Sequence, residues 1–413
     1  MRNKLLFFLA LLLTMMVQVT WAQHVTQEQA KEIASQFLKG QSTKQGGRRN
    51  APAASALKTA VVFNAKDTSG QPYLYAVTDT RQSGFVLVSG DERFNAVLGY
   101  SDDGTFDEQN MPENMRAFLQ DYIDEMKYLE SIDYQPMESA RRAAPAGFAA
   151  IEPMMTTTWN QDNPYNMYCP QYDNYGNKCP TGCLATALAQ VMCYHGNYKK
   201  TGQSTTTLKA IPAYQTSTMK YNILEKPIRT FDWTKMTGTT PSTSEAKEEV
   251  ARLMEYIGSG VKIDYRQGGT GGSVSYIPSL VTDVFGYDSK VREVNRNNYS
   301  DYEWLNMMYH ELSTNGPVMY SGQATNGGHG FVLDGYKYEN NEHLFHINWG
   351  WGGMSDGYFL LSVCYPDEQG IGGSTSQAGF NRAQGAIIDM DPNGSGTQQS
   401  NIRLYDYKIT LGH

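Results

Sequence analysis

A stretch of small residues, prolines and arginines at positions 137–154 constrains the fold most, because it divides the chain into two unlike parts. It reads MESARRAAPAGFAAIEPM and contains the dibasic pair Arg141-Arg142. Exposed segments of this kind join domains and are cut by proteases. All five cysteines lie after it, with six of the seven histidines. At 413 residues the chain also exceeds the usual size of one domain, so we expect a cysteine-free N-terminal unit and a larger C-terminal one.

Residues 1–22 have the pattern of a secretory signal peptide. Arg2 and Lys4 precede an apolar run from Leu5 to Val17, and Ala22 is a small residue at the expected cleavage position. A membrane anchor needs about 20 apolar residues, and no later stretch approaches that length. We therefore expect no membrane span in the mature protein. We expect it to be secreted or held in the periplasm or cell envelope.

Composition excludes several classes of function. Charged residues make up 18% of the chain and aromatic residues 12%, which is typical of a folded protein and excludes a disordered or fibrous one. The net charge of -8 provides no basic field for nucleic acid or an anionic membrane. Five cysteines are too few for a disulfide scaffold, and their odd number leaves at least one thiol without an intramolecular bridge.

Periodicity predicts an α+β class for both units. The N-terminal unit should contain a helix that starts at the capping box of Thr26 and ends at Gly40, two strands and a second helix. These last three elements are expected at 72–77, 84–88 and 113–129. In the C-terminal unit, helices come first and strands follow, which favours a segregated α+β domain. The helices are expected at 184–195, 243–257 (capped by Ser242) and 301–314 (capped by Ser300), and the strands at 318–321, 330–336, 343–349 and 358–363.

Cys183 is the strongest candidate for a chemical role. The apolar stripe Leu184, Leu188, Val191 has helical spacing, which places Cys183 in the first turn and off the buried face. Unpaired backbone N–H groups and the positive end of the helix dipole lower a thiol pKa there. The Cys183 amide could also bind an oxyanion. By position alone, a buried structural cysteine is an equally good interpretation.

The other cysteines have weaker signals. Cys193 lies within the same helix and Cys364 ends an apolar strand, so both are expected to be packed. Cys169 and Cys179 lie close in a loop-rich stretch and could form a bridge. Zinc requires paired cysteines at close spacing, which this set does not supply, so no metal is expected.

His329 has the setting that a general base needs. Glycines flank it at the start of an apolar strand, which leaves the ring accessible. If that strand turns back near residues 339–341, His329 and Asn348 fall roughly opposite each other. Asn348 could then bond one ring nitrogen, and Trp349 could shield that bond from water. Gln161 is a candidate oxyanion donor only in combination with these residues.

Four motifs in this order resemble the streptopain-type (C10) papain-like cysteine peptidases, a family of exported bacterial zymogens. They are NQDNPYN at 160–166, GCLATA at 182–187, GHGFV at 328–332 and NWGWGG at 348–353. The resemblance covers about 150–392 closely and 23–140 more loosely.

The resemblance implies a papain-like catalytic domain with two lobes, one helical and one of antiparallel strands, preceded by an α+β propeptide. The implied boundaries are a signal peptide at 1–22, an inhibitory propeptide at 23–145, a peptidase domain at 146–392 and an unassigned extension at 393–413. A glycine-rich stretch at 370–374 would be a mobile loop beside the cleft. The implied partners are polypeptide substrates and the protein's own propeptide, with no cofactor.

The resemblance also assigns roles to residues. Cys183 would be the nucleophile and His329 the general base and acid, with Gln161 as an oxyanion donor. Asn348 and Trp349 would orient His329. The backbone at Gly271 and Gly328 would touch the substrate peptide, and a bulky apolar side chain would be preferred two positions before the scissile bond.

Two functions other than peptide hydrolysis are also compatible with parts of the sequence. A thiol amidase or acyltransferase would use the same cysteine–histidine pair and differ only in the shape of its cleft. An exported adhesin or glycan-binding protein would explain the many tyrosines and tryptophans, but not the placement of Cys183 and His329.

Overall fold

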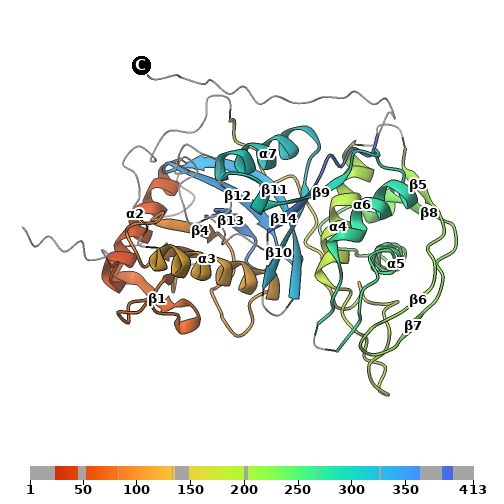
Figure 1. Ribbon diagram of the computed structural model, residues 1–413, viewed down its shortest axis with the longest axis horizontal. Helices are drawn as coiled ribbons and strands as arrows, with labels where there is room; N and C mark the ends of the chain where they lie inside the picture. Colours follow the sequence, from red (N-terminus) through yellow and green to blue (C-terminus); the bar gives the residue numbers. More distant parts are fainter. Residues whose placement is uncertain are drawn as a thin grey trace, which may run out of the picture.

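The computed structural model describes residues 24–44, 53–81, 83–132, 134, 148–199, 203–267, 269–324, 327–362 and 384–393. The expected signal peptide, Cys364, the loop at 370–374 and nearly all of the C-terminal extension lie outside these ranges. Figure 1 shows an N-terminal unit beside a β lobe, with a helical lobe on the far side of that β lobe.

The N-terminal unit packs two helices against a small antiparallel sheet. The capping box is confirmed: the Gln29 amide N–H donates to the Thr26 hydroxyl, and the Thr26 amide donates to the Gln29 side chain. The expected helix end at Gly40 is wrong, since the helix continues to Lys44. The elements are α2 (Gln27–Lys44), β1 (Leu57–Val61), β2 (Leu74–Asp79), β3 (Phe85–Ser89), β4 (Val97–Ser101) and α3 (Glu113–Ser131).

The helical lobe is built around one buried helix. α4 (Cys183–Tyr194) is buried at every position from Leu184 to Cys193 and lies against α5 (Ser244–Gly260). The Thr243 side chain caps α5 by accepting from the Ala246 amide, so the expected cap at Ser242 is wrong by one residue. Shorter elements complete the lobe: β5 (Thr205–Leu208), β6 (Tyr214–Gln215), β7 (Asn222–Ile223), β8 (Arg229–Asp232) and α6 (Ile277–Ser279).

The β lobe is an antiparallel sheet covered by one helix, so the expected division into a helical and a β lobe is confirmed. α7 (Asp301–Thr314) has the capping box predicted at Ser300 and Glu303. The long hairpin turns at Asn340 and Asn341, as expected. The strands are β9 (Arg292–Asn295), β10 (Val318–Ala324), β11 (Gly327–Glu339), β12 (Glu342–Asn348), β13 (Gly357–Phe359) and β14 (Gly385–Ile388).

The two sheets join into one. All ten strands form a single sheet in the order β1-β2-β3-β4-β13-β12-β11-β10-β14-β9, and the junction is the antiparallel pair β4–β13. Tyr358 pairs with Tyr100 and Phe359 with Gly99. Because β13 is the edge of the C-terminal sheet, the N-terminal unit extends that sheet by strand addition.

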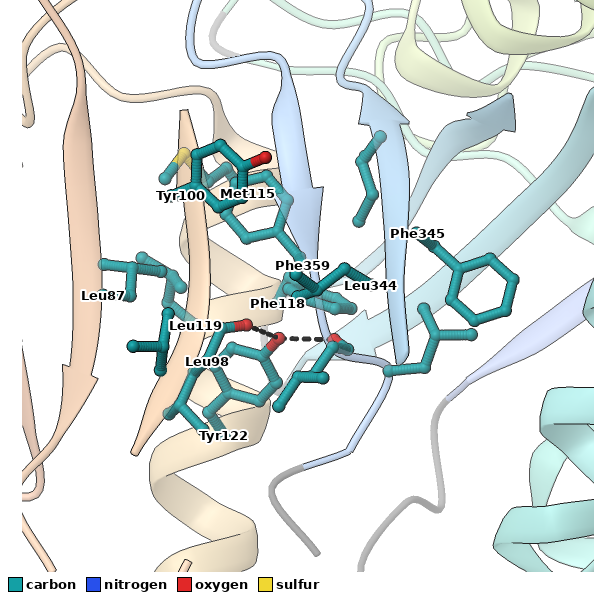
Figure 2. Packing of buried hydrophobic residues seen from close by; sticks show 14 of the residues in the cluster. Leu87, Leu98, Tyr100, Met115, Phe118, Leu119, Tyr122, Leu344, Phe345 and Phe359 are labelled. Carbon is teal, nitrogen blue, oxygen red and sulfur yellow. Dashed lines mark hydrogen bonds between the residues drawn. The ribbon is translucent and has the colours of Figure 1, made fainter. Parts of the chain in front are cut away.

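Helix α3 seals this junction (Figure 2). The Phe118 ring makes edge contacts with Phe331, Trp349 and Phe359 of the β lobe. One turn further on, the Tyr122 hydroxyl lies within hydrogen-bonding range of the carbonyl oxygens of Leu98 and Leu360, one from each side of the seam. The two units therefore share one continuous apolar core.

We expect Gly99→Ala to loosen the junction. A Cβ at Gly99 would come within 2.4 Å of the Phe359 ring and 2.9 Å of the Tyr358 carbonyl. Overpacking of this kind costs about 1–3 kcal/mol. Urea unfolding in a Cys183→Ala background, which removes any self-cleavage, should show a lower midpoint for Gly99→Ala.

The matched control is Gly40→Ala in α2. A Cβ there meets only Asn340 Oδ1 at 3.9 Å, and alanine stabilises a helix interior by about 0.5–1 kcal/mol relative to glycine. An unchanged midpoint for Gly99→Ala would contradict tight packing at this seam.

Candidate active site

Cys183 is the first residue of α4, and Gly182 before it makes the sharp entry into the helix possible. Gly182 has φ +90°, a conformation that glycine adopts without strain. An added Cβ would also lie 2.3 Å from Thr270 Oγ1. The expected helix start is thus confirmed, with the thiol at the end where helix N–H groups are free.

A cavity of about 130 Å³ brings together three of the sequence-predicted site residues. Its lining includes Gln161, Cys183 and His329 from the C-terminal domain and Glu113 and Asn114 from the N-terminal unit; Gly269, Thr270 and Trp351 complete the wall. Gln161 is tied to the cysteine segment because the Thr181 amide donates to its carbonyl oxygen at 2.9 Å. Residues from five other stretches of the chain therefore meet around one thiol.

The electrostatics of the pair are those of a neutral thiol and a neutral imidazole. Burial raises the pKa of the Cys183 thiol, and the Glu113 carboxylate adds to that rise. Hydrogen bonds from the backbone amides of Gly330 and Leu184 act in the opposite direction but do not outweigh burial. The Gly330 amide lies 3.3 Å from Sγ. The expectation of a lowered thiol pKa is therefore wrong for this state, because desolvation exceeds the helix-terminus effect.

His329 shows the complementary shift, since burial lowers the pKa of its imidazole. An imidazolium–thiolate pair is favoured only when each charge is solvated or paired. Both shifts oppose charge separation while the N-terminal unit covers the cavity.

Asn114, at the start of α3, makes the closest polar contact between the N-terminal unit and the site. Its side-chain amide donates to the Gly330 carbonyl at 3.1 Å and to the Trp349 carbonyl at 2.6 Å. Asn114 is only 1% exposed. One side-chain amide of the N-terminal unit thus bonds the backbone next to His329 and next to Asn348. The sequence provided no signal for this residue, because nothing local marks which turn of α3 will reach the site.

The structure corrects the expected pairing of His329 with Asn348. The hairpin pairs Glu339 with Glu342, and this register alone would set Asn348 opposite Leu333; a β-bulge between Leu333 and Gly335 moves it by one residue, to Val332. The Asn348 side chain instead donates to the Thr157 carbonyl at 2.9 Å and accepts from Gln190 Nε2 at 3.1 Å. It also accepts from the Gly350 amide at 3.0 Å. The turn at Asn340 and Asn341 therefore already separates Asn348 from His329 by several positions, and the bulge changes this by only one.

Trp349 is a core residue and Trp351 is the tryptophan at the cavity. The Trp349 indole N–H donates to the Ser355 carbonyl at 2.9 Å, and its ring packs on Phe118. Trp351, two positions on, lines the cavity, and its buried indole Nε1 has no hydrogen-bond partner among the described residues. The motif at 348–353 contains both tryptophans, and its spacing alone did not indicate which one faces the site.

The two glycines expected to touch substrate lie beside the cavity. Gly271 has both its amide and its carbonyl bonded to Asp264, at 3.3 and 2.7 Å, so Gly269 and Thr270 are the members of this loop that line the cavity. Gly328 pairs with Gln323 in the β10–β11 ladder, directly before His329. Their contact with a peptide stays a prediction.

The three other cysteines that the structure describes lie in the core of the helical lobe. Cys169, Cys179 and Cys193 are buried free thiols, so the possible Cys169–Cys179 bridge is absent. Burial raises the pKa of Cys169 and of Cys193 to about 12, which makes both poor nucleophiles. Among the described residues, no three histidine, cysteine or carboxylate side chains gather as a metal site would require. In the same ranges, no helix is both long enough and apolar enough to cross a membrane.

Comparison with known proteins assigns both halves of the chain. The peptidase C10 family model matches residues 159–359, and the Spi protease inhibitor model matches residues 22–126. Streptopain from Streptococcus pyogenes serotype M28 is 32% identical over 379 residues, covering 89% of this chain and 92% of that protein.

Two further proteins are similar to this chain. The thiol protease/hemagglutinin PrtT of Porphyromonas gingivalis is 29% identical over 405 residues, covering 94% of this chain and 44% of that protein. Among solved structures, a fragment of Prevotella intermedia prointerpain A shares the fold with a TM-score of 0.59 and 24% identity; the match covers 80% of this chain and 98% of the fragment.

The pKa shifts predict how fast Cys183 reacts with iodoacetamide. Alkylation needs the thiolate, so a raised thiol pKa makes the reaction of the full-length protein slow at neutral pH and still rising with pH in the alkaline range. Once the N-terminal unit is released, solvation should lower the thiol pKa, and the rate should level off at lower pH. Intact mass measures both species in one sample. Identical pH profiles for the two species would contradict this account.

We expect Asn114→Ala to speed release of the N-terminal unit. Losing a buried hydrogen-bond partner costs about 1–3 kcal/mol, which corresponds to a rise of roughly 5- to 150-fold in the open population. The half-time of conversion of the full-length protein at high dilution measures this change. Asn110→Ala is the control, because Asn110 is exposed and bonds only Asp107 among the described residues. Equal half-times for the two variants would show that Asn114 does not hold the closed state.

Proposed function

Because this chain belongs to the peptidase C10 family of cysteine peptidases, we propose that Cys183 and His329 are the pair that hydrolyses the peptide bond. The chain is a cysteine endopeptidase with an inhibitor-like propeptide domain in front of a papain-like catalytic domain. The shared cavity that contains Cys183, His329 and Gln161 is the observation that carries the assignment of roles.

In the proposed acylation step, the Cys183 proton passes to the His329 imidazole as sulfur attacks the peptide carbonyl carbon. The carbonyl oxygen becomes an oxyanion. When it collapses, the C–N bond breaks and the imidazolium gives its proton to the leaving amine. Water, deprotonated by His329, then attacks the thioester and releases the carboxylic acid and the free thiol.

The proposed oxyanion site combines the Gln161 side chain with the Cys183 backbone N–H. Gln161 is supported by its place in the cavity wall and by its anchored backbone. The N–H of Cys183 is at the helix terminus, where it has no partner within the helix. Donors held in place before the reaction stabilise the charge that develops on the carbonyl oxygen. Orientation of His329 by Asn348 and Trp349 stays a prediction for the processed enzyme.

The proposed regulation is release of an intramolecular inhibitor by self-cleavage. Glu113 and Asn114 form part of the cavity wall, and the N-terminal unit that carries them is joined to the β lobe at the β4–β13 seam. We propose that cutting within the linker that includes Arg141-Arg142 frees a propeptide spanning 23–145 from a peptidase domain spanning 146–392. The signal peptide at 1–22 would export the precursor out of the cytoplasm.

The proposed substrates are polypeptides with a bulky apolar side chain two positions before the scissile bond. The thiol amidase or acyltransferase alternative uses the same pair, and no residue that the structure describes favours it over peptide hydrolysis. The adhesin alternative fails on the family match, which covers the region of the two proposed catalytic residues.

The comparison of wild type with Cys183→Ala tests the whole proposal. Intact mass over time should show the wild-type precursor losing its N-terminal unit and then gaining one thiol-directed epoxide at Cys183, while Cys183→Ala does neither. If wild-type Cys183 stays unlabelled after the linker is cut in trans, the assignment fails.

Gln161→Ala tests the oxyanion site separately. Loss of one donor should lower kcat by about 10²–10³ with a much smaller change in KM, because the bond forms only in the transition state. The kcat of each variant is calculated from the concentration of active sites, which is measured by titration with the epoxide. Asn160→Ala, whose side chain accepts from the Gln161 amide, controls for disturbance of the loop. A loss of the same size in Asn160→Ala would remove the case for Gln161.

A further inference from the structure

Gln190 is a buried glutamine to which the proposed mechanism gives no role. It lies on α4 seven residues after Cys183, which is two helical turns and therefore the same face of the helix. Its side chain is completely inaccessible to solvent. A buried amide of this kind must satisfy both a donor group and an acceptor group, so its partners define what it does.

The partners of Gln190 belong to the two loops that frame the cavity. Its Oε1 atom accepts from the Thr157 hydroxyl at 2.9 Å and from the Trp159 amide at 3.1 Å. Trp159 is two residues before Gln161. Both hydrogen bonds to this oxygen therefore come from the segment that carries Gln161, the proposed oxyanion donor.

On its other side, Gln190 Nε2 donates to Asn348 Oδ1 at 3.1 Å. That same oxygen accepts from the Gly350 amide, and Asn348 Nδ2 returns to the Thr157 carbonyl at 2.9 Å. These hydrogen bonds link Gln190, Asn348 and Thr157 in a closed ring. The ring fixes the start of the loop that ends in the cavity-lining Trp351.

We propose that Gln190 is a positioning residue for catalysis, which sets the helix bearing Cys183 at a fixed distance from both the Gln161 loop and the 348–351 loop. The inference rests on the proposed function of Cys183 and Gln161. Gln190 touches no reacting atom, and it acts through Trp159 and Asn348. A misplacement of about 1 Å between catalytic groups can lower a rate by roughly 10²-fold, so a link that spans all three segments has a catalytic consequence.

Charge near Gln190 does not complicate the test. The small cavity beside it is lined by neutral groups, which are Met155, Thr156, Thr157, Cys193, Tyr194, Asn197, Met236, Thr237 and Gly238. A carboxylic acid placed there would have a raised pKa, because burial disfavours the charged form. When protonated, it could donate to Asn348 as the amide does. When ionised, it would have no proton to donate, and two acceptor oxygens would face each other, one from the carboxylate and one from Asn348.

The experiment compares Gln190→Glu and Gln190→Leu in the processed enzyme, with kcat and KM measured per active site titrated by the epoxide. Gln190→Leu should lower kcat by tenfold or more at every pH, with KM changed less. For Gln190→Glu, the ratio of its kcat to that of wild type should rise as pH falls from about 8 to about 5.5, as the buried acid takes up its proton. Gln384→Glu is the matched control, since Gln384 is a buried glutamine that bonds Tyr320.

The proposal is overturned if the ratio of the Gln190→Glu kcat to the wild-type kcat does not vary with pH. It is also overturned if the variants have fewer titratable sites but each remaining site keeps the wild-type kcat. If the Gln190 variants do not fold, Thr157→Val and Thr157→Ser decide. Valine removes one donor to Gln190 and should lower kcat, while serine keeps the hydroxyl and should restore it. Equal kcat for these two would also overturn the proposal. Failure of the proposed function would appear differently, as a wild-type enzyme with no titratable site.

Discussion

The contact of α3 with the β lobe is the interaction on which the described structure depends. Phe118 inserts into an aromatic cluster that contains Trp349, and Asn114 bonds the backbone on both sides of the cavity. Apolar burial supplies the affinity of such a contact, while a desolvated amide paired with two carbonyls fixes its register. The same helix therefore contributes both to the shared apolar core and to the wall of the proposed active-site cavity.

The proposed inhibition is electrostatic as well as steric. Burial raises the pKa of the Cys183 thiol and lowers the pKa of the His329 imidazole, and Glu113 of the N-terminal unit adds to the rise at the sulfur. Each effect favours the neutral pair, whereas peptide attack needs the charged one. A helix terminus lowers a thiol pKa only when solvent or a counter-charge supports the anion. In the proposed activation, release of the N-terminal unit removes Glu113 from the site and returns solvent to Cys183, which favours the thiolate.

Much of the catalytic site is predictable from local pattern. Cys183 follows a glycine at a helix start and His329 lies between glycines at a strand start, and both positions are readable from spacing. Gln161 became a candidate only through its order relative to these two. The expected pairing of Asn348 with His329 was wrong, because the turn at Asn340 and Asn341 already places Asn348 near Leu333, and a bulge of one residue moves it only to Val332. Gln190 and Asn114 had no local signal, since their roles depend on which distant backbone atoms they reach.

The sequence by itself determined the division of the chain, the class of each half, most helices with their caps, and the thiol and imidazole of the candidate site. These follow from periodicity, capping chemistry and glycine placement, which act over a few residues. Only the tertiary structure decided that β4 joins β13, that Trp351 rather than Trp349 lines the cavity, and that burial raises the Cys183 pKa. Those outcomes depend on contacts between segments more than 100 positions apart, and no local pattern encodes the desolvation or the register that such contacts impose.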